Sequence, residues 1–346
     1  MEMADRAHPP ESLPPALPLI GAHISTAGGL GQVPIRAQAI GAETVQVFSS
    51  NPRTWPVHPP DPELLAVFAA SLGELRLPLF LHTIYLVNLA SPDAELRRRS
   101  ARAVTHALVT GALAGAAAVV THVGSHRGEG FARAVPGVEQ AIGAALTTAR
   151  QELAMLRPAG ADRSLPRLLL ETGAGSGATV GRSLEELEVL MAPSAAELGL
   201  CLDTAHLFAA GYPIHRAAGL ETFVAELSQR ELLNRVGLVH LNDSRVPFAC
   251  NRDRHADPGQ GELGYDSLAR VVGHPALACL SFILETPGPD GHGPGAAEIG
   301  LVKTMRAASP GRQEARPCGE RGRGGSASPG PDGHRRLRAS PPAPRA

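Results

Sequence analysis

The sequence predicts an α/β fold, a (β/α)8 TIM barrel formed as a single domain by residues 19–308. Eight short apolar runs recur along the chain, helical patterns lie between them, and neighbouring runs are about one β/α unit apart. The expected strands are Leu19–His23, Thr44–Phe48, Pro78–His82, Ala118–His122, Arg167–Glu171, Leu198–Asp203, Val236–Leu241 and Leu280–Glu285. A doubly wound open sheet is the alternative topology for this alternation.

The intervening segments carry helix signals. A helix is expected over Asp93–Ala114, entered through Ser91 with Pro92 at its first position, because proline is favoured there. A second is expected over Ser183–Met191, where Glu186 follows Ser183 at the spacing of a capping box. After the last strand the chain is rich in Gly and Pro, and only Ala296–Ala308 can supply the final helix. We therefore expect weaker barrel closure there.

The two ends differ in composition from the rest of the chain. Five of the first 18 residues are proline, and residues 309–346 hold seven Pro and seven Gly, with Leu337 as the only large aliphatic. Such segments bury too little apolar surface to become ordered. We expect residues 1–18 and 309–346 to be disordered extensions. The second has eight Arg against three acids, so it is either a solvated tail or a weak DNA tether.

Composition excludes several classes of protein. The formal charge is −1, so any attraction for nucleic acid must be local rather than global. The four cysteines show no CxxC pairing, which fits a reducing cytoplasm better than secretion. The first residues lack the apolar segment of a signal peptide, and no stretch predicts a membrane span. We expect a cytoplasmic protein that acts at the nucleoid, without a membrane partner.

Six of the eight expected strands end in a residue type that binds metals. Successive members are 32 to 49 residues apart, and the carboxyl ends of barrel strands converge on one face, where active sites form. One histidine at a strand end is usually structural, but six such residues in register predict a site. They are His82, His122, Glu171, Asp203, His240 and Glu285.

Three further residues extend this set. His206 follows Asp203 by three positions, and Asp253 and His255 lie in the loop after the seventh strand. The nine residues are five histidines and four carboxylates, which suit zinc, manganese or iron. Nine ligands exceed the need of one ion and match two or three. Paired metals activate water and stabilise both oxygens of a phosphodiester transition state, for which Glu171 is suited to bridge two ions.

From Ile20 to Thr286 the chain resembles endonuclease IV, the zinc-dependent apurinic/apyrimidinic endonuclease family. All nine metal positions of the family pattern are filled in order. The motifs that carry the resemblance are GAHISTAGGL, QVFSSNPRTW, LHTIYLVNLASP, VTHVGSH, LLLETGAGSG, CLDTAHLFAAGY, VHLNDS, DRH followed by GQGELG, and ILETP.

The resemblance implies three divalent metals, Zn2+ with Mn2+ possible in part. The first metal would be held by His82, His122 and Glu171. The second would be held by Glu171, Asp203, His240 and Glu285, and the third by His206, Asp253 and His255. It further implies a phosphoric diester hydrolase of the deoxyribonuclease IV type, with Glu171, Glu285 and Asp203 as catalytic residues. Hydrolysis 5′ to an abasic site would leave a 3′-hydroxyl and a 5′-deoxyribose phosphate, and blocked 3′ ends would be trimmed.

The implied partner is double-stranded DNA with abasic sites or blocked 3′ ends, bound by a monomer. Arg53 and Tyr85 match family positions that enter DNA near the lesion. The chain departs from the family after His255, where Asp257 and Pro258 replace the usual residues in the loop beside the third metal. His292 lies in the Gly- and Pro-rich stretch after the last strand and is expected to be exposed.

Two other functions remain open. Sugar isomerases and epimerases of the xylose-isomerase-like group bind one divalent metal with a Glu, Asp, His, Glu set, which Glu171, Asp203, His240 and Glu285 match. The additional histidines and Asp253 argue against that reading. A barrel that binds damaged DNA without cleaving it is the third hypothesis, and the altered loop after His255 is its only support.

Overall fold

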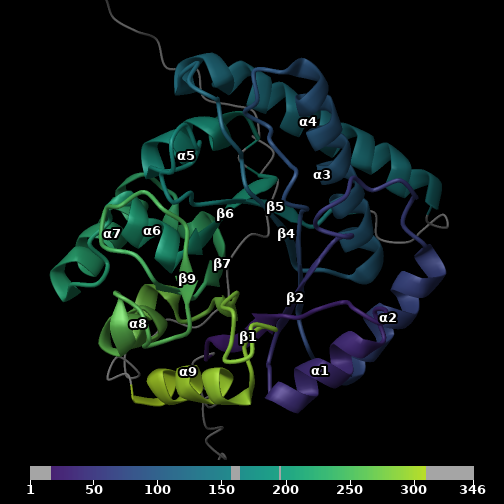
Figure 1. Ribbon diagram of the computed structural model, residues 1–346. Coiled ribbons are helices and arrows are strands. Elements are labelled where there is room, and N and C mark those ends of the chain that lie inside the picture. The colour runs from purple at the N-terminus through teal and green to yellow at the C-terminus, as the bar shows by residue number, and fades with distance from the viewer. Residues whose placement is uncertain (1–16, 157–163, 195, 309–346) are drawn as a thin grey trace, which may run out of the picture.

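The computed structural model describes residues 17–156, 164–194 and 196–308. Eight parallel strands close into a barrel in the order β1-β10-β7-β6-β5-β4-β3-β2 (Figure 1). This confirms the predicted (β/α)8 fold and excludes the open sheet. The barrel strands are β1 Leu19–His23, β2 Val45–Phe48, β3 Leu79–His82, β4 Ala118–Thr121, β5 Arg167–Glu171, β6 Leu198–Asp203, β7 Val236–His240 and β10 Ser281–Leu284.

Helices surround the barrel on all sides in Figure 1. They are α1 Gln32–Ile40, α2 Pro62–Glu74, α3 Ala94–Ala114, α4 Phe131–Leu156, α5 Leu184–Met191, α6 Thr204–Ala210, α7 Ala217–Gln229, α8 Gly264–Gly273 and α9 Ala296–Ala308. Short 3-10 turns cover Ala192–Ser194, Leu233–Arg235 and Pro275–Leu277, and a two-stranded hairpin pairs β8 Asp243–Ser244 with β9 His255–Ala256. Within the described ranges, no helix is both long and apolar enough to cross a membrane.

The helix starts follow side-chain capping. At α3 the Asp93 carboxylate accepts hydrogen bonds from the backbone N–H groups of Glu95 and Leu96, so the cap is Asp93 and Pro92 precedes it. The predicted place of Pro92 inside the helix was wrong, because the carboxylate one residue later satisfies the free donors. At α5, Ser183 caps the helix as predicted by accepting from the Glu186 N–H, while the Glu186 carboxylate accepts from the N–H groups of Gly181 and Arg182, just before the cap residue of the expected capping box.

The barrel closes between β1 and β10, where weaker closure was expected. Four residue pairs join these strands, as many as join β4 to β5 in the middle of the sheet. The final helix is α9, with the predicted bounds. Arg306 on α9 donates to the Pro18 carbonyl at 2.6 Å and to the Glu43 carboxylate at 2.6 and 3.1 Å, which fastens the last helix to the first strands.

The predicted extensions, residues 1–18 and 309–346, lie almost wholly outside the described residues, which begin at residue 17 and end at residue 308. Their disorder remains a prediction.

Candidate metal centre

On each barrel strand that ends in a candidate ligand, this residue lies on the same face as the side chains that point into the barrel interior. Side chains two residues apart point to the same face of a strand. An apolar cluster fills the barrel interior with Phe80, Ala118, Val120, Leu169, Cys201, Leu238 and Ile283. Each of the six predicted strand-end residues comes two positions after a member of this cluster. The strand pleat therefore places all six above the apolar core, at the carboxyl mouth.

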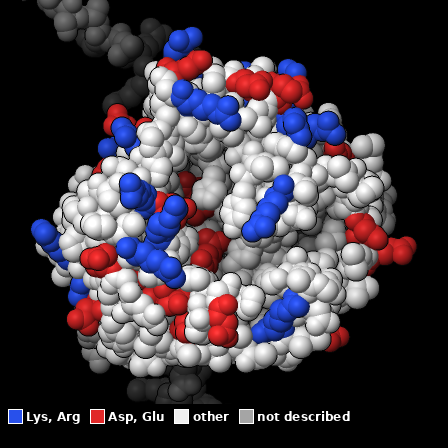
Figure 2. All heavy atoms as spheres, in the orientation of Figure 1, with Lys and Arg blue, Asp and Glu red and all other residues white. Residues whose placement is uncertain are grey.

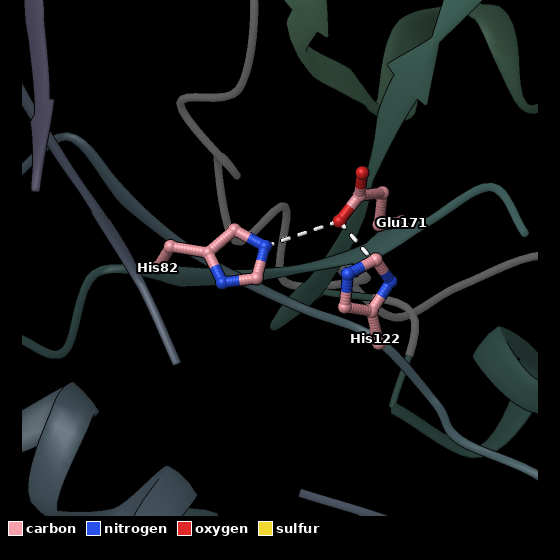
Figure 3. Close-up of side chains that lie close together, drawn as sticks. All are labelled: His82, His122 and Glu171. Atoms are coloured by element: carbon pink, nitrogen blue, oxygen red, sulfur yellow. Dashed lines mark hydrogen bonds and ion pairs between the residues drawn. The ribbon is translucent and has the colours of Figure 1, made fainter. Parts of the chain in front are cut away.

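Glu171, at the end of β5, lies at the centre of these residues. Its Oε2 is 3.1 Å from His82 Nε2 and 3.4 Å from His122 Nδ1, and both rings point toward it (Figure 3). Its Oε1 is 3.1 Å from His240 Nδ1 and 3.5 Å from His206 Nδ1. The carboxylate thus presents one oxygen to each half of the cluster, as a bridging ligand must.

The remaining predicted residues form the other side of the pocket. Asp253 lies between two imidazoles, with Oδ2 3.2 Å from His206 Nε2 and Oδ1 3.1 Å from His255 Nε2. His255 Nε2 is also 3.6 Å from Asp203 Oδ2, which brings Asp203 into this group. The structure therefore brings all nine predicted residues to one pocket. Potential ligand atoms lie within 4.8 Å of one another in three overlapping groups: His82, His122, Glu171; Asp203, His206, His255; and Glu171, Asp203, His240, Glu285.

Hydrogen bonds fix which nitrogen of several histidines faces this pocket. His82 Nδ1 is 2.7 Å from the Thr83 carbonyl, and His206 Nδ1 is 2.8 Å from the Thr172 carbonyl. A carbonyl oxygen only accepts, so these Nδ1 atoms carry the proton and donate. The opposite nitrogens of the neutral rings then have free lone pairs, which is the usual arrangement of metal-binding histidines.

Two of these nitrogens make no hydrogen bond that compensates their burial. His206 Nε2 and His255 Nε2 are inaccessible to solvent and face the Asp253 carboxylate at 3.2 and 3.1 Å, but among the described residues neither atom makes a hydrogen bond of suitable geometry. A buried polar atom without a partner costs roughly 1–3 kcal/mol, so such atoms require an explanation. Imidazole nitrogens directed at carboxylates, with thiolates absent from the set, fit a borderline divalent cation such as zinc or manganese.

The pocket also stabilises positive charge. Burial by itself raises the pKa of a carboxyl group, but the imidazoles of His122 and His240 outweigh this and hold the pKa of Glu171 well below its usual range. Burial lowers the pKa of His255, yet the carboxylates of Asp203 and Asp253 raise it to about 9. Protonated rings or bound cations can both supply the charge that these carboxylates require.

Sequence reasoning missed Gln46 on β2, which is completely buried. Its amide nitrogen donates to Glu285 Oε1 at 2.6 Å, and its carbonyl oxygen accepts from His240 Nε2 at 2.9 Å. Gln46 thus orients two candidate ligands and directs His240 Nδ1 toward Glu171. The sequence offered one indication of Gln46: it is a polar residue two positions before Phe48, so both side chains lie on the face of β2 that points into the barrel.

The loop after His255 is held by Asp243, whose buried carboxylate accepts from the backbone N–H groups of Gly259, Gly261 and Leu263 at 2.9–3.0 Å. A Cβ on Gly261 would lie 2.4 Å from the Ser244 carbonyl oxygen, so glycine is required at this close approach. This anchoring accounts for the glycine at position 261 of the GQGELG sequence. It also keeps His255 in the pocket despite the unusual residues that follow it.

The pocket opens into a cleft of about 510 Å3 at the mouth of the barrel. Figure 2 shows acidic side chains inside a hollow at the centre of this face, with basic side chains around it. Tyr85 lines the cleft, is 63% exposed and packs edge-on against Phe48 with ring centroids 4.9 Å apart. Arg53 is exposed on the loop after β2, one residue beyond the cleft-lining Pro52.

Comparison with known proteins first defines the class. The family model described as "Xylose isomerase-like TIM barrel" matches residues 35–306, which agrees with a closed barrel that carries metal-binding residue types at its mouth. A D-tagatose 3-epimerase-like protein, with a TM-score of 0.57 and 14% identity over 83% of this chain and 95% of its own, shares the fold alone.

More similar relatives define the family. A probable endonuclease 4 from Halothermothrix orenii is 33% identical over 83% of this chain and 99% of its own length. One from Methanoculleus marisnigri is 36% identical over 78% and 92%. The crystal structure of endonuclease IV from Thermus thermophilus has a TM-score of 0.68 at 33% identity, over 84% of this chain and 98% of that one. The chain belongs to the endonuclease IV family.

Proposed function

We propose that this protein is a DNA-repair endonuclease that hydrolyses the phosphodiester 5′ to abasic sites in double-stranded DNA. It leaves a 3′-hydroxyl and a 5′-deoxyribose phosphate, and it also trims blocked 3′ ends. The observation that carries the proposal is the set of three overlapping ligand groups, with the two oxygens of Glu171 facing different halves of the pocket. Membership of the endonuclease IV family supports the same reaction.

The residues fit a cluster of three divalent metals, most simply zinc. When bound, such ions acidify water and stabilise the negative charge that develops on the attacking and leaving oxygens of a phosphodiester. His82, His122 and Glu171 would hold the first ion, and Glu171, Asp203, His240 and Glu285 the second. His206, Asp253 and His255 would hold the third, with Asp203 close enough to assist.

The chain itself positions these groups and the DNA. Glu171 joins the two halves of the pocket, and Gln46 keeps Glu285 and His240 oriented before substrate arrives. Such preorganisation reduces the rearrangement needed during the reaction. Tyr85, exposed beside Phe48, is placed to wedge into the minor groove, and Arg53 to contact the DNA beside the lesion.

A sugar epimerase is the second candidate, because Glu171, Asp203, His240 and Glu285 form a group that is sufficient for one metal. That activity would leave His82, His122, His206, Asp253 and His255 in the pocket without a function. The cytoplasmic location, the monomeric state and the DNA substrate expected from the sequence fit the nuclease and remain predictions.

Incision of a duplex carrying one tetrahydrofuran abasic analogue tests the proposal. The analogue resists β-elimination, so cleavage on its 5′ side must be hydrolytic, and extension by a polymerase will reveal the 3′-hydroxyl. We expect incision by the wild-type protein and by Glu74→Ala, a control at an exposed position of α2. Glu171→Ala should lose incision by several orders of magnitude because the bridging carboxylate is absent.

Folding of the Glu171→Ala variant is checked by circular dichroism. Full incision by this variant would refute the mechanism. Turnover of ketoses to aldoses by a wild-type protein that leaves the DNA intact would instead establish the epimerase.

A further inference from the structure

The segment between β10 and α9 forms a compact loop at the barrel mouth. The Gly293 N–H donates to the Pro287 carbonyl at 2.8 Å and closes the loop. Gly288 has a φ of +68°, and a Cβ there would lie 1.9 Å from the Gly293 carbonyl oxygen. Glycine is therefore required at position 288, and the Gly- and Pro-rich composition encodes a defined loop, residues 287–293, rather than a loose linker.

Asp257 connects this loop to the hairpin that carries His255. Its side chain is 7% exposed, and its Oδ1 accepts from the Gly288 N–H at 2.9 Å. A buried carboxylate needs such a partner, so this contact fixes the position of the loop. The Gly- and Pro-rich segment after Glu285 thus contacts the segment after His255, and the two form one unit.

The loop places His292 in the catalytic cleft. His292 is exposed, as predicted, but it lines the same cleft as Tyr85 and as seven of the nine candidate ligands, Glu171 among them. Ser25 and Thr26, in the loop after β1, line this cleft as well, and β1 pairs directly with β10. An imidazole and two hydroxyl groups on adjacent loops are a suitable set of donors for phosphate oxygens.

We propose that His292 is a substrate-positioning residue that binds a phosphate of the DNA backbone in the cleft, and that Asp257 holds its loop in place through Gly288. This inference deepens the proposed function and rests on it for the identity of the ligand. Among the described residues, no hydrogen bond or ion pair joins His292 to a candidate metal ligand. His292 therefore acts on substrate binding and not on metal retention.

Steady-state incision of the tetrahydrofuran duplex tests this role. For His292→Ala we expect KM to rise about tenfold with kcat and metal content unchanged, as loss of one hydrogen bond to a charged group would cause. Asp257→Ala should raise KM similarly, and the double variant should add little, because both changes remove the same contact. His292→Arg, which also donates to phosphate, should restore most of the affinity. His58→Ala, at an exposed histidine outside this cleft, should behave as wild type.

Binding of the same duplex, followed by fluorescence anisotropy, separates this inference from the proposed function. Weaker binding by His292→Ala and Asp257→Ala supports the inference even where the wild-type protein binds without incising. If the wild-type protein incises and His292→Ala matches it in both KM and Kd, the inference is wrong. A His292→Ala effect that His292→Arg does not relieve also overturns it, because a merely structural role would give that result.

Discussion

Gln46 illustrates how much of the pocket depends on a residue outside the set of candidate metal ligands. It joins Glu285 to His240, two candidate ligands on adjacent strands, and its two polar atoms have different partners. The ligands were accessible to sequence reasoning because His, Asp and Glu at strand ends are uncommon and repeat in register. A single glutamine within an apolar strand carries no such pattern, and only the closed barrel shows what it contacts.

Replacing Gln46 with leucine tests this role. The apolar side chain cannot bond to either ligand, so the His240 ring loses the acceptor that orients it. We expect metal affinity or activity to fall roughly 10- to 100-fold, the usual effect of removing a partner of a metal ligand. Metal retained after dialysis against a chelator and the incision rate measure this effect. Gln38→Leu, on the exposed side of α1, is the matched control, and equal metal retention by both variants would contradict the role.

At the scale of elements, the sequence predicted the strands within one or two residues because each is a short apolar run bounded by polar or turn residues. The β8–β9 hairpin was not predicted, since two-residue strands show no periodicity. Barrel closure was underestimated for a different reason. Its fastening depends on Glu43, in the turn before β2, and Arg306, 263 residues later, and sequence spacing gives no indication of that contact.

Glu43→Gln tests the fastening of α9. Burial raises the pKa of Glu43, but hydrogen bonds from Arg306 and the Ile20 N–H outweigh it, so the pKa in the folded protein is lowered. A lowered pKa contributes stability that is present above the ordinary pKa and lost as the pH falls through the folded value. We expect the substitution to lower the free energy of unfolding by about 1 kcal/mol at pH 7.

The difference between wild type and Glu43→Gln should shrink as the pH falls below the ordinary glutamate pKa of about 4.3 and through the lowered pKa of the folded protein, because the wild-type carboxyl then becomes protonated. Urea unfolding at pH 7 and in this acidic range measures the difference in stability, with the exposed Glu74→Gln as the control. A difference that stays constant with pH would show that the carboxylate charge does not stabilise this contact.

At the scale of the whole molecule, acidic and basic side chains gather in different places on the surface. The net charge of the chain therefore does not indicate the charge of any one face. The chain carries a formal charge of −1, yet acidic side chains gather inside the hollow at the barrel mouth and basic ones lie around it. Under the proposed function, phosphates approaching this face would meet arginines such as Arg252 and Arg254, which are exposed next to Asp253. Only folding brings these charges together, so composition could not have indicated the proposed DNA-binding face.

Residues 309–346 lie outside the described residues, and their excess of arginine leads to a separate prediction. Truncation after Ala308 should weaken non-specific DNA binding and flatten its dependence on salt, because fewer counterions are released from the DNA. Titration of undamaged duplex at several salt concentrations measures the slope. An unchanged slope would show that the tail does not contact DNA.

The central claim is that the pocket holds three metals that act together on a phosphodiester. Metal-free protein would be reconstituted with increasing Zn2+, and bound metal and incision of the tetrahydrofuran duplex would be measured on the same samples. We predict that incision continues to rise until about three ions are bound per chain, one for each ligand group at the barrel mouth. Full incision with one ion per chain, or none with three bound, would contradict the claim.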